Sequence, residues 1–237
     1  MSALLALLAC GGSPPLAPAE PVSVEPIPAP VSPAPIPPEA VEVPVDTDPV
    51  ARPPESLTGW RDVSDLEGVA LDIRYATTDN FAGRVLDGYA KPGAWLRDVP
   101  FEGLQKASAA ARERGFTLVV FDAYRPERAS RDMVRWAAEV HKEHLLKQGY
   151  IAARSGHNRG HTIDLTLAGP DGPLEMGTAY DTFSVQAHTA NADGEAAANR
   201  AILLEVMAVG GFRNYAKEWW HFSHASGPWD PIDVPYE

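Results

Sequence analysis

The stretch SGHNRGHTIDLTL, residues 155–167, combines a predicted strand with several chemically active side chains. Its second half alternates apolar and polar residues, and this period of two predicts a β-strand over Ile163 to Leu167. The apolar members of that strand would face a core, while Asp164 and Thr166 would face the other side, which can be a cleft. Because a glycine lies between His157 and the strand, a turn can bring the His157 imidazole back beside the Asp164 carboxylate.

A second stretch, EWWH at residues 218–221, supplies another carboxylate and another imidazole. Zinc hydrolases need three protein ligands, an open position for water and a general base beside that water. The two stretches together contain this set, although either motif alone is weak evidence for a metal. On an ideal strand Glu218 and His221 would point to opposite faces, so they share a site only if the chain bulges or coils between them.

A third imidazole, that of His161, is a further metal candidate because it follows His157 by four residues. The glycine between them disfavours a helix, which would be needed to place both side chains on one face. We therefore expect His161 to lie behind the ligands or at the surface.

The remaining pattern predicts a mixed fold. Strands or extended segments are expected at 69–75, 117–121 and 218–223, and helices at 103–114, 126–147 and 195–209. Strands and helices do not alternate as regular βαβ units. The sequence therefore favours the α+β class, with a mainly antiparallel central sheet flanked by helices.

Composition divides the chain of 237 residues into two parts. Residues 11–57 hold 15 of the 23 prolines and carry seven acids against one base, a composition typical of a disordered proline-rich tether. Residues 58–237 have an ordinary composition and are numerous enough to bury a core without disulfides. The net charge of −12 argues against nucleic acid or an anionic membrane surface as the main partner.

The only cysteine, Cys10, ends the apolar run ALLALLAC at residues 3–10. This pattern is typical of a lipoprotein signal over residues 1–10, in which Cys10 is lipidated and becomes the mature N-terminus. It predicts a protein of the bacterial cell envelope that faces the periplasm and touches the membrane only through its lipid anchor. An ordinary cleaved signal or a buried N-terminal segment is the alternative.

The order of the motifs resembles that of the D-alanyl-D-alanine dipeptidases of the vancomycin-resistance type. These are zinc peptidases related to D,D-carboxypeptidases and to the Hedgehog signalling domain. Besides the two stretches above, four segments are similar and occur in family order over about residues 60 to 225: RYATTDNFAG (74–83), DGY (87–89), FDAYRPERA (121–129) and MGTAYD (176–181). The resemblance implies a Hedgehog- and D,D-peptidase-like fold for residues 58–237.

The resemblance also implies an activity, the hydrolysis of the free dipeptide D-Ala-D-Ala to D-alanine by metal-activated water. The implied roles are zinc ligation by His157, Asp164 and His221, with one Zn²⁺ per chain, general base catalysis by Glu218, oxyanion stabilisation by Arg125, ammonium binding by Asp181, and framing of the dipeptide pocket by Ser155, Tyr75 and Tyr89. His161 departs from the family pattern, in which a small residue is expected.

Two other functions remain open, a peptidoglycan D,D- or L,D-carboxypeptidase and a non-catalytic zinc-binding module. An ammonium-binding Asp181 suits a free dipeptide better than a long stem peptide. The presence of both Glu218 and Arg125 favours catalysis over a module that only binds zinc. Purely structural roles also exist, since Arg125 could form a salt bridge at the start of the next helix and Asp181 could simply form a turn.

Overall fold

The structure is a computed structural model that describes residues 50–237. The predicted signal with Cys10, and the predicted tether as far as residue 49, lie outside the described residues. Residues 50–57, which the composition assigns to the tether, contact the folded domain. Ala51 is buried, its amide donates to Pro92 O at 2.8 Å, and Trp95 Nε1 donates to Ala51 O at 2.6 Å. A proline-rich segment lacks core-forming residues, yet its backbone can still pair with a folded surface.

The strands are Trp60–Asp62 (β1), Val69–Leu71 (β2), Trp95–Arg97 (β3), Thr117–Asp122 (β4), Thr162–Gly169 (β5), Gly172–Pro173 (β6), Phe212–Asn214 (β7) and His221–His224 (β8). The α-helices are Asp98–Arg112 (α1), Glu127–Glu139 (α2), His144–Gln148 (α3) and Gly194–Val209 (α4). Short 3₁₀ turns lie at Val63–Asp65, Arg74–Ala76, His157–Arg159 and Val185–Ala187.

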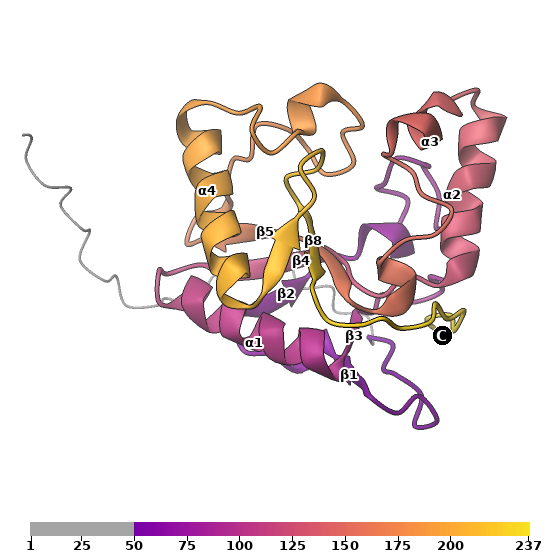
Figure 1. Cartoon of the computed structure of the whole chain (residues 1–237), viewed down its shortest axis with the longest axis horizontal. Helices are drawn as coiled ribbons and strands as arrows, with labels where there is room; N and C mark the ends of the chain where they lie inside the picture. Colours follow the sequence, from indigo (N-terminus) through magenta and orange to yellow (C-terminus); the bar gives the residue numbers. More distant parts are fainter. Residues whose placement is uncertain (1–49) are drawn as a thin grey trace, which may run out of the picture. The chain divides into compact units, whose positions relative to one another are not determined.

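The central sheet has six strands, with the order β2-β4-β5-β8-β7 and with β6 paired to β5. Only the β2–β4 pair is parallel, and the other pairs of this sheet are antiparallel. Figure 1 shows α4 and the α2–α3 pair on opposite sides of the central strands, with α1 along the lower edge of the view. The predicted α+β class with a mainly antiparallel sheet is therefore confirmed.

Three predicted elements are shorter than expected. The extended segment expected over 218–223 begins only at His221, the first residue of β8. The strand expected over 69–75 ends at Leu71, and the chain then forms the 3₁₀ turn Arg74–Ala76. The helix expected over 126–147 ends at Glu139, because His141 adopts a left-handed φ of 58° and the Lys142 amide donates back to Ala137 O at 2.7 Å. That reversal starts a separate short helix, α3. Neither break is marked by a proline or glycine, which are the usual local signals.

Helices α1 and α4 approach each other closely where Gly103 meets Gly210. A Cβ atom on Gly103 would lie 2.4 Å from Gly210 O, so any side chain there would push the elements apart. The predicted apolar face of α1 is confirmed, since Leu104, Ala107 and Ala111 are fully buried. Within residues 50–237, no helix combines the length and apolarity needed to cross a membrane.

Candidate active site

The site is built on the register of three neighbouring strands. Asp164 on β5 lies opposite Asp122 of β4 on one side and opposite His221 of β8 on the other. The pairing of β4 with β5 is irregular between Val120 and Asp122, which is the mark of a β-bulge. The bulge sets Asp122 level with Asp164, so three polar residues form one row across the sheet.

A tight turn places His157 above this row. The His157 imidazole is fully buried, and its Nδ1 lies 2.6 Å from Ala123 O, which can only accept a hydrogen bond. Nδ1 therefore carries the proton and Nε2 is left as a ligand atom. The turn ends at Gly160 with a left-handed φ of 72°, where a Cβ atom would lie 2.3 Å from the Trp60 ring. Glycine is required there by both the conformation and the space.

Glu218 and His221 share the site because Glu218 precedes β8 in a turn. The His221 amide donates to Glu218 O at 3.3 Å, which closes a turn of four residues. Asn214 holds the turn, because its Nδ2 donates to Glu218 O at 2.9 Å and to His221 O at 3.0 Å. The sequence required a bulge or coil between Glu218 and His221, and this turn provides it. Glu218 Oε2 lies 3.5 Å from His221 Nδ1.

Three side-chain atoms that could hold a metal ion lie close together, one from each predicted ligand. His157 Nε2 lies 3.2 Å and His221 Nδ1 3.0 Å from Asp164 Oδ1, and the three atoms all fall within 4.8 Å of one another. Asp164 Oδ1 is buried and makes no hydrogen bond. Burial alone would raise the pKa of Asp164, but the two imidazoles hold that pKa well below its usual value. A buried, unpartnered carboxylate oxygen between two imidazoles fits a divalent metal of the zinc type.

Arg125 follows β4 and is buried against Asp122. Its Nε and Nη2 atoms lie 2.9 and 2.8 Å from Asp122 Oδ2, and Nη2 lies 3.6 Å from Asp164 Oδ2. Asp122 also accepts from the Tyr89 hydroxyl at 2.5 Å and lies 3.3 Å from His157 Nδ1. The Arg125 salt bridge is thus made with a buried carboxylate behind the site, not as a cap of the next helix.

Asp181 offers a carboxylate that is only half satisfied. Its Oδ1 accepts from the Tyr75 hydroxyl at 3.2 Å, while its Oδ2 is buried without a hydrogen-bond partner. Burial and the neighbouring Asp164 carboxylate raise the pKa of Asp181 well above its usual value. The residue does lie in a turn, with a left-handed φ of 58°, and it also lines the two cavities described below. A cationic group on Oδ2 would satisfy this oxygen.

One cavity of about 370 Å³ joins these groups. It is lined by Asp164, His221, Glu218, Arg125, Asp181, Tyr75 and Ser155, together with apolar and aromatic neighbours. Burial and the Asp164 charge raise the pKa of Glu218 well above its usual value, which suits a group that must accept a proton. The volume is at the small end for ligand cavities, which span about 300–1,000 Å³.

Three residues considered as ligands or pocket residues do not line this cavity. His157 is fully buried and is connected to the cavity through its contacts with Asp164 and His221. Tyr89 is fully buried behind Asp122, so it supports the Arg125 partner and does not frame the pocket. His161 packs against the Trp229 ring, with its Nδ1 3.3 Å from Ser226 O. Its place outside the cavity agrees with the expectation that it lies behind the ligands or at the surface.

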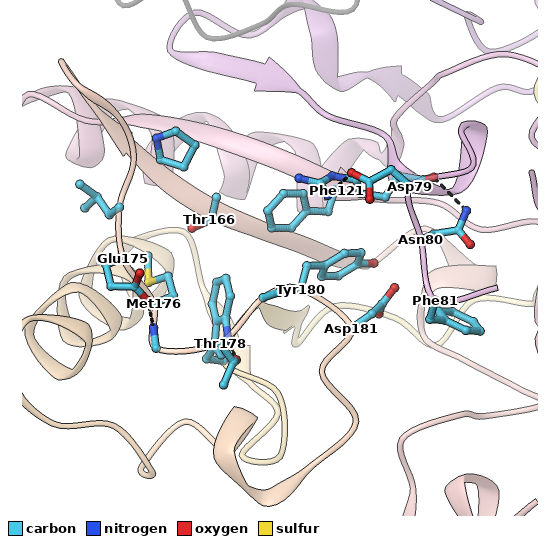
Figure 2. Close-up of a pocket in the computed structure, with 16 residues that line it drawn as sticks. Asp79, Asn80, Phe81, Phe121, Thr166, Glu175, Met176, Thr178, Tyr180 and Asp181 are labelled. Carbon is cyan, nitrogen blue, oxygen red and sulfur yellow. Dashed lines mark hydrogen bonds and ion pairs between the residues drawn. The ribbon is translucent and has the colours of Figure 1, made fainter. Parts of the chain in front are cut away.

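A second cavity of about 760 Å³ adjoins the first, and Phe81 and Asp181 line both. Figure 2 shows it, with Thr166 on β5 and with Tyr180 and Asp181 on the segment that follows. Asp164 lines the first cavity and Thr166 the second, so the predicted polar face of the strand does face open space.

Sequence reasoning missed two residues that touch the site. Asp122 holds Arg125 and His157, and the Tyr180 hydroxyl lies 3.0 Å from Asp164 Oδ2 and 2.8 Å from the Tyr75 hydroxyl. The available signal for Asp122 was an acid at the end of a buried strand, three residues before Arg125. The only sequence signal for Tyr180 was its position next to Asp181.

Comparisons with known proteins identify related sequences over most of the described chain. The family profile described as D-Ala-D-Ala dipeptidase, of the M15 peptidases, matches residues 58–236. A D-alanyl-D-alanine dipeptidase of Enterococcus faecalis is 37% identical over 188 residues, which cover 72% of this chain and 90% of that protein. Corresponding values are 36% over 180 residues (69% and 89%) for one from Streptomyces coelicolor and 33% over 161 residues (67% and 78%) for one from Escherichia coli. The chain therefore belongs to the D-Ala-D-Ala dipeptidase family of peptidases.

Proposed function

We propose that the protein is a zinc-dependent dipeptidase that hydrolyses free D-Ala-D-Ala to two molecules of D-alanine. The observation that carries the proposal is that Asp181, whose Oδ2 has no hydrogen-bond partner, lines the same small cavity as Asp164, His221 and Glu218. A buried carboxylate without a partner favours a cationic ligand, and the free amino end of a dipeptide is an ammonium group at neutral pH.

Zinc would be held by His157 Nε2, Asp164 Oδ1 and His221 Nδ1. The His157 tautomer is already fixed by Ala123 O, and the Asp164 carboxylate is held by the Tyr180 hydroxyl at its other oxygen. Such supporting bonds orient ligands before the metal arrives. When bound, zinc supplies Lewis acidity that makes a water molecule easier to deprotonate at neutral pH.

Glu218 would accept a proton from the attacking water and pass it to the nitrogen of the leaving D-alanine as the peptide C–N bond breaks. The raised pKa of Glu218 places its proton affinity closer to neutrality than that of an exposed glutamate. Arg125 would face the negative charge that develops on the carbonyl oxygen. Its guanidinium is already oriented by Asp122, so little reorganisation is needed when that charge appears.

The cavity also supports a short substrate over a long peptide. Its volume of about 370 Å³ suits a dipeptide, and Asp181 gives the amino end a defined position. A peptidoglycan carboxypeptidase would instead need a neutral group at the place of Asp181, where the amino end of its substrate continues outward.

The direct test is hydrolysis of D-Ala-D-Ala by the full chain before and after removal of metal by a chelator. Activity should be lost on chelation and restored by one equivalent of zinc. His157→Ala should lower bound zinc and abolish activity, because it removes a ligand from the set. Undiminished zinc in that variant, or hydrolysis that survives complete metal removal, would contradict the proposal.

A further inference from the structure

Among the charged side chains that line the active-site cavity, one arginine has no ion-pair partner within the described residues. Three carboxylates line it, those of Asp164, Asp181 and Glu218, and two guanidiniums, those of Arg125 and Arg154. The Arg125 guanidinium is held by Asp122 and lies near Asp164. Arg154 is exposed, and the described residues offer it neither a carboxylate within ion-pair distance nor a hydrogen-bond acceptor.

The backbone around Arg154 is anchored on its C-terminal side. The amide of the next residue, Ser155, donates to Asn158 Oδ1 at 2.8 Å. Asn158 is itself buried, and its Nδ2 donates to Arg125 O at 2.8 Å and to Ser130 Oγ at 2.9 Å. The starting point of the Arg154 side chain is therefore tied to the same buried network that positions the catalytic groups.

A dipeptide carries a charge at each end, and the cavity accounts for only one of them. Asp181 offers an oxygen to the ammonium. The C-terminal carboxylate needs a cation that no buried carboxylate already holds, and Arg125 does not meet that condition because of Asp122. An arginine suits this role since its planar guanidinium can donate two parallel hydrogen bonds to a carboxylate.

We propose that Arg154 binds the C-terminal carboxylate of the substrate and so sets the enzyme's preference for a free carboxyl end. This inference rests on the proposed dipeptidase function and deepens it. Asp181 and Arg154 then recognise the two ends of one zwitterion. Blocking the amino end removes the partner of Asp181, and blocking the carboxyl end removes the partner of Arg154, so each change should lower the rate of hydrolysis. A peptide extended at its C-terminus likewise lacks a carboxylate at the position proposed for Arg154.

The test compares two substrates, D-Ala-D-Ala and D-Ala-D-alaninamide, in which a neutral amide replaces the carboxylate while the scissile bond is unchanged. For the wild-type chain, kcat/KM should be higher for the carboxylate substrate, and added salt should reduce that preference because it screens an exposed arginine. In Arg154→Gln the preference should fall by roughly tenfold, which is the loss of about 1.4 kcal/mol of charge-assisted hydrogen bonding. The fall should come from the carboxylate substrate, with little change for the amide.

Two variants control the measurement. Arg213→Gln makes the same chemical change at an exposed arginine of β7 that does not line the cavity, and it should leave both substrates unaffected. Arg154→Lys keeps the positive charge and should retain part of the preference. Zinc content and thermal stability of all three variants should match the wild type.

An unchanged preference in Arg154→Gln would overturn the assignment of Arg154 while leaving the dipeptidase function intact. An equal loss on both substrates would also overturn it, because it would mean that Arg154 only supports the loop. If the wild-type chain cleaves neither substrate, the proposed function itself fails, and the inference fails with it.

Discussion

At the scale of single residues, the account depends on Glu218 acting without binding the metal. We expect Glu218→Gln to keep its zinc, because the ligand cluster consists of His157, Asp164 and His221. Turnover should fall by a factor of order 10² or more, since a neutral amide cannot take the proton of the attacking water. Metal analysis and steady-state kinetics on the same preparation measure both quantities.

The matched control is Glu102→Gln, the same change at an exposed position of α1. It should leave zinc content and kcat unchanged. Near-normal turnover in Glu218→Gln would mean that another group is the base, and a loss of zinc in that variant would mean that Glu218 belongs to the metal site.

Some residues of the candidate site could be predicted from the sequence and others could not. Residue type and spacing predicted that His157, Asp164 and His221 come together with Glu218, and the structure brings these side chains together. Asp181 was predicted only from the family resemblance. Asp122 and Arg154 could not be recognised in the same way. The role of Asp122 arises from a bulge that sets it opposite Asp164, and that register depends on a strand about 40 residues away in the chain.

At the scale of elements, one buried carboxylate joins the loop before β3 to helix α2. Asp132 on α2 accepts from Arg84 Nη2 at 2.8 Å, from the Asp87 amide at 3.0 Å and from Arg135 Nη2 at 2.8 Å. Burial alone would raise the pKa of Asp132, but these hydrogen bonds and the two arginines lower it below its usual value. The ionised form of Asp132 is therefore stabilised more in the folded state than in the unfolded chain.

A depressed pKa stabilises the fold at neutral pH, and this contribution is lost as the pH falls from about 4 through the lower folded-state value. We expect Asp132→Asn to lower the free energy of unfolding at pH 7 by roughly 1–3 kcal/mol. The difference between variant and wild type should shrink as the pH is lowered below about 4. Urea unfolding at several pH values measures this, and a difference that does not depend on pH would exclude the electrostatic explanation.

Predicted elements were most accurate where one local pattern acts alone. The strand 163–167 and the helix 195–209 were placed to within two residues of the structure, because alternation and glycine stops decide them. The break after Glu139 has no local signal, and the spacing of Glu218 and His221 indicated a bulge or coil without specifying what holds it. The first is a reversal through His141, and the second is held by the Asn214 side chain, which reaches back across the turn.

At the scale of the whole molecule, the start of the folded domain can be tested by truncation. A chain that begins at Val50 should match the full chain in thermal stability and in activity on a soluble dipeptide. A chain that begins at Thr58 loses the buried Ala51, the Ala51–Pro92 and Trp95–Ala51 hydrogen bonds and the Arg52–Asp65 ion pair. We expect a lower midpoint of thermal unfolding for the shorter chain, by a few degrees, because about 1–2 kcal/mol is lost.

Activity on a soluble dipeptide should survive in both truncated chains at a temperature where both are folded, since residues 50–57 do not line the active-site cavity. Equal unfolding midpoints would show that residues 50–57 add nothing to the fold and that the composition boundary at residue 58 is also the structural one.

The central claim is that the cavity binds a free dipeptide by its ammonium group. The most direct test compares free D-Ala-D-Ala with its N-acetyl form at equal concentration, in the wild-type chain and in Asp181→Asn. The wild-type chain should strongly prefer the free dipeptide. Asp181→Asn should lower kcat/KM for that substrate by roughly one to two decades while zinc content stays normal, because a charge-assisted hydrogen bond is worth about 1.5–3 kcal/mol. If the acetylated compound is cleaved as fast as the free dipeptide or faster, the enzyme is a carboxypeptidase, and the role of Asp181 is contradicted.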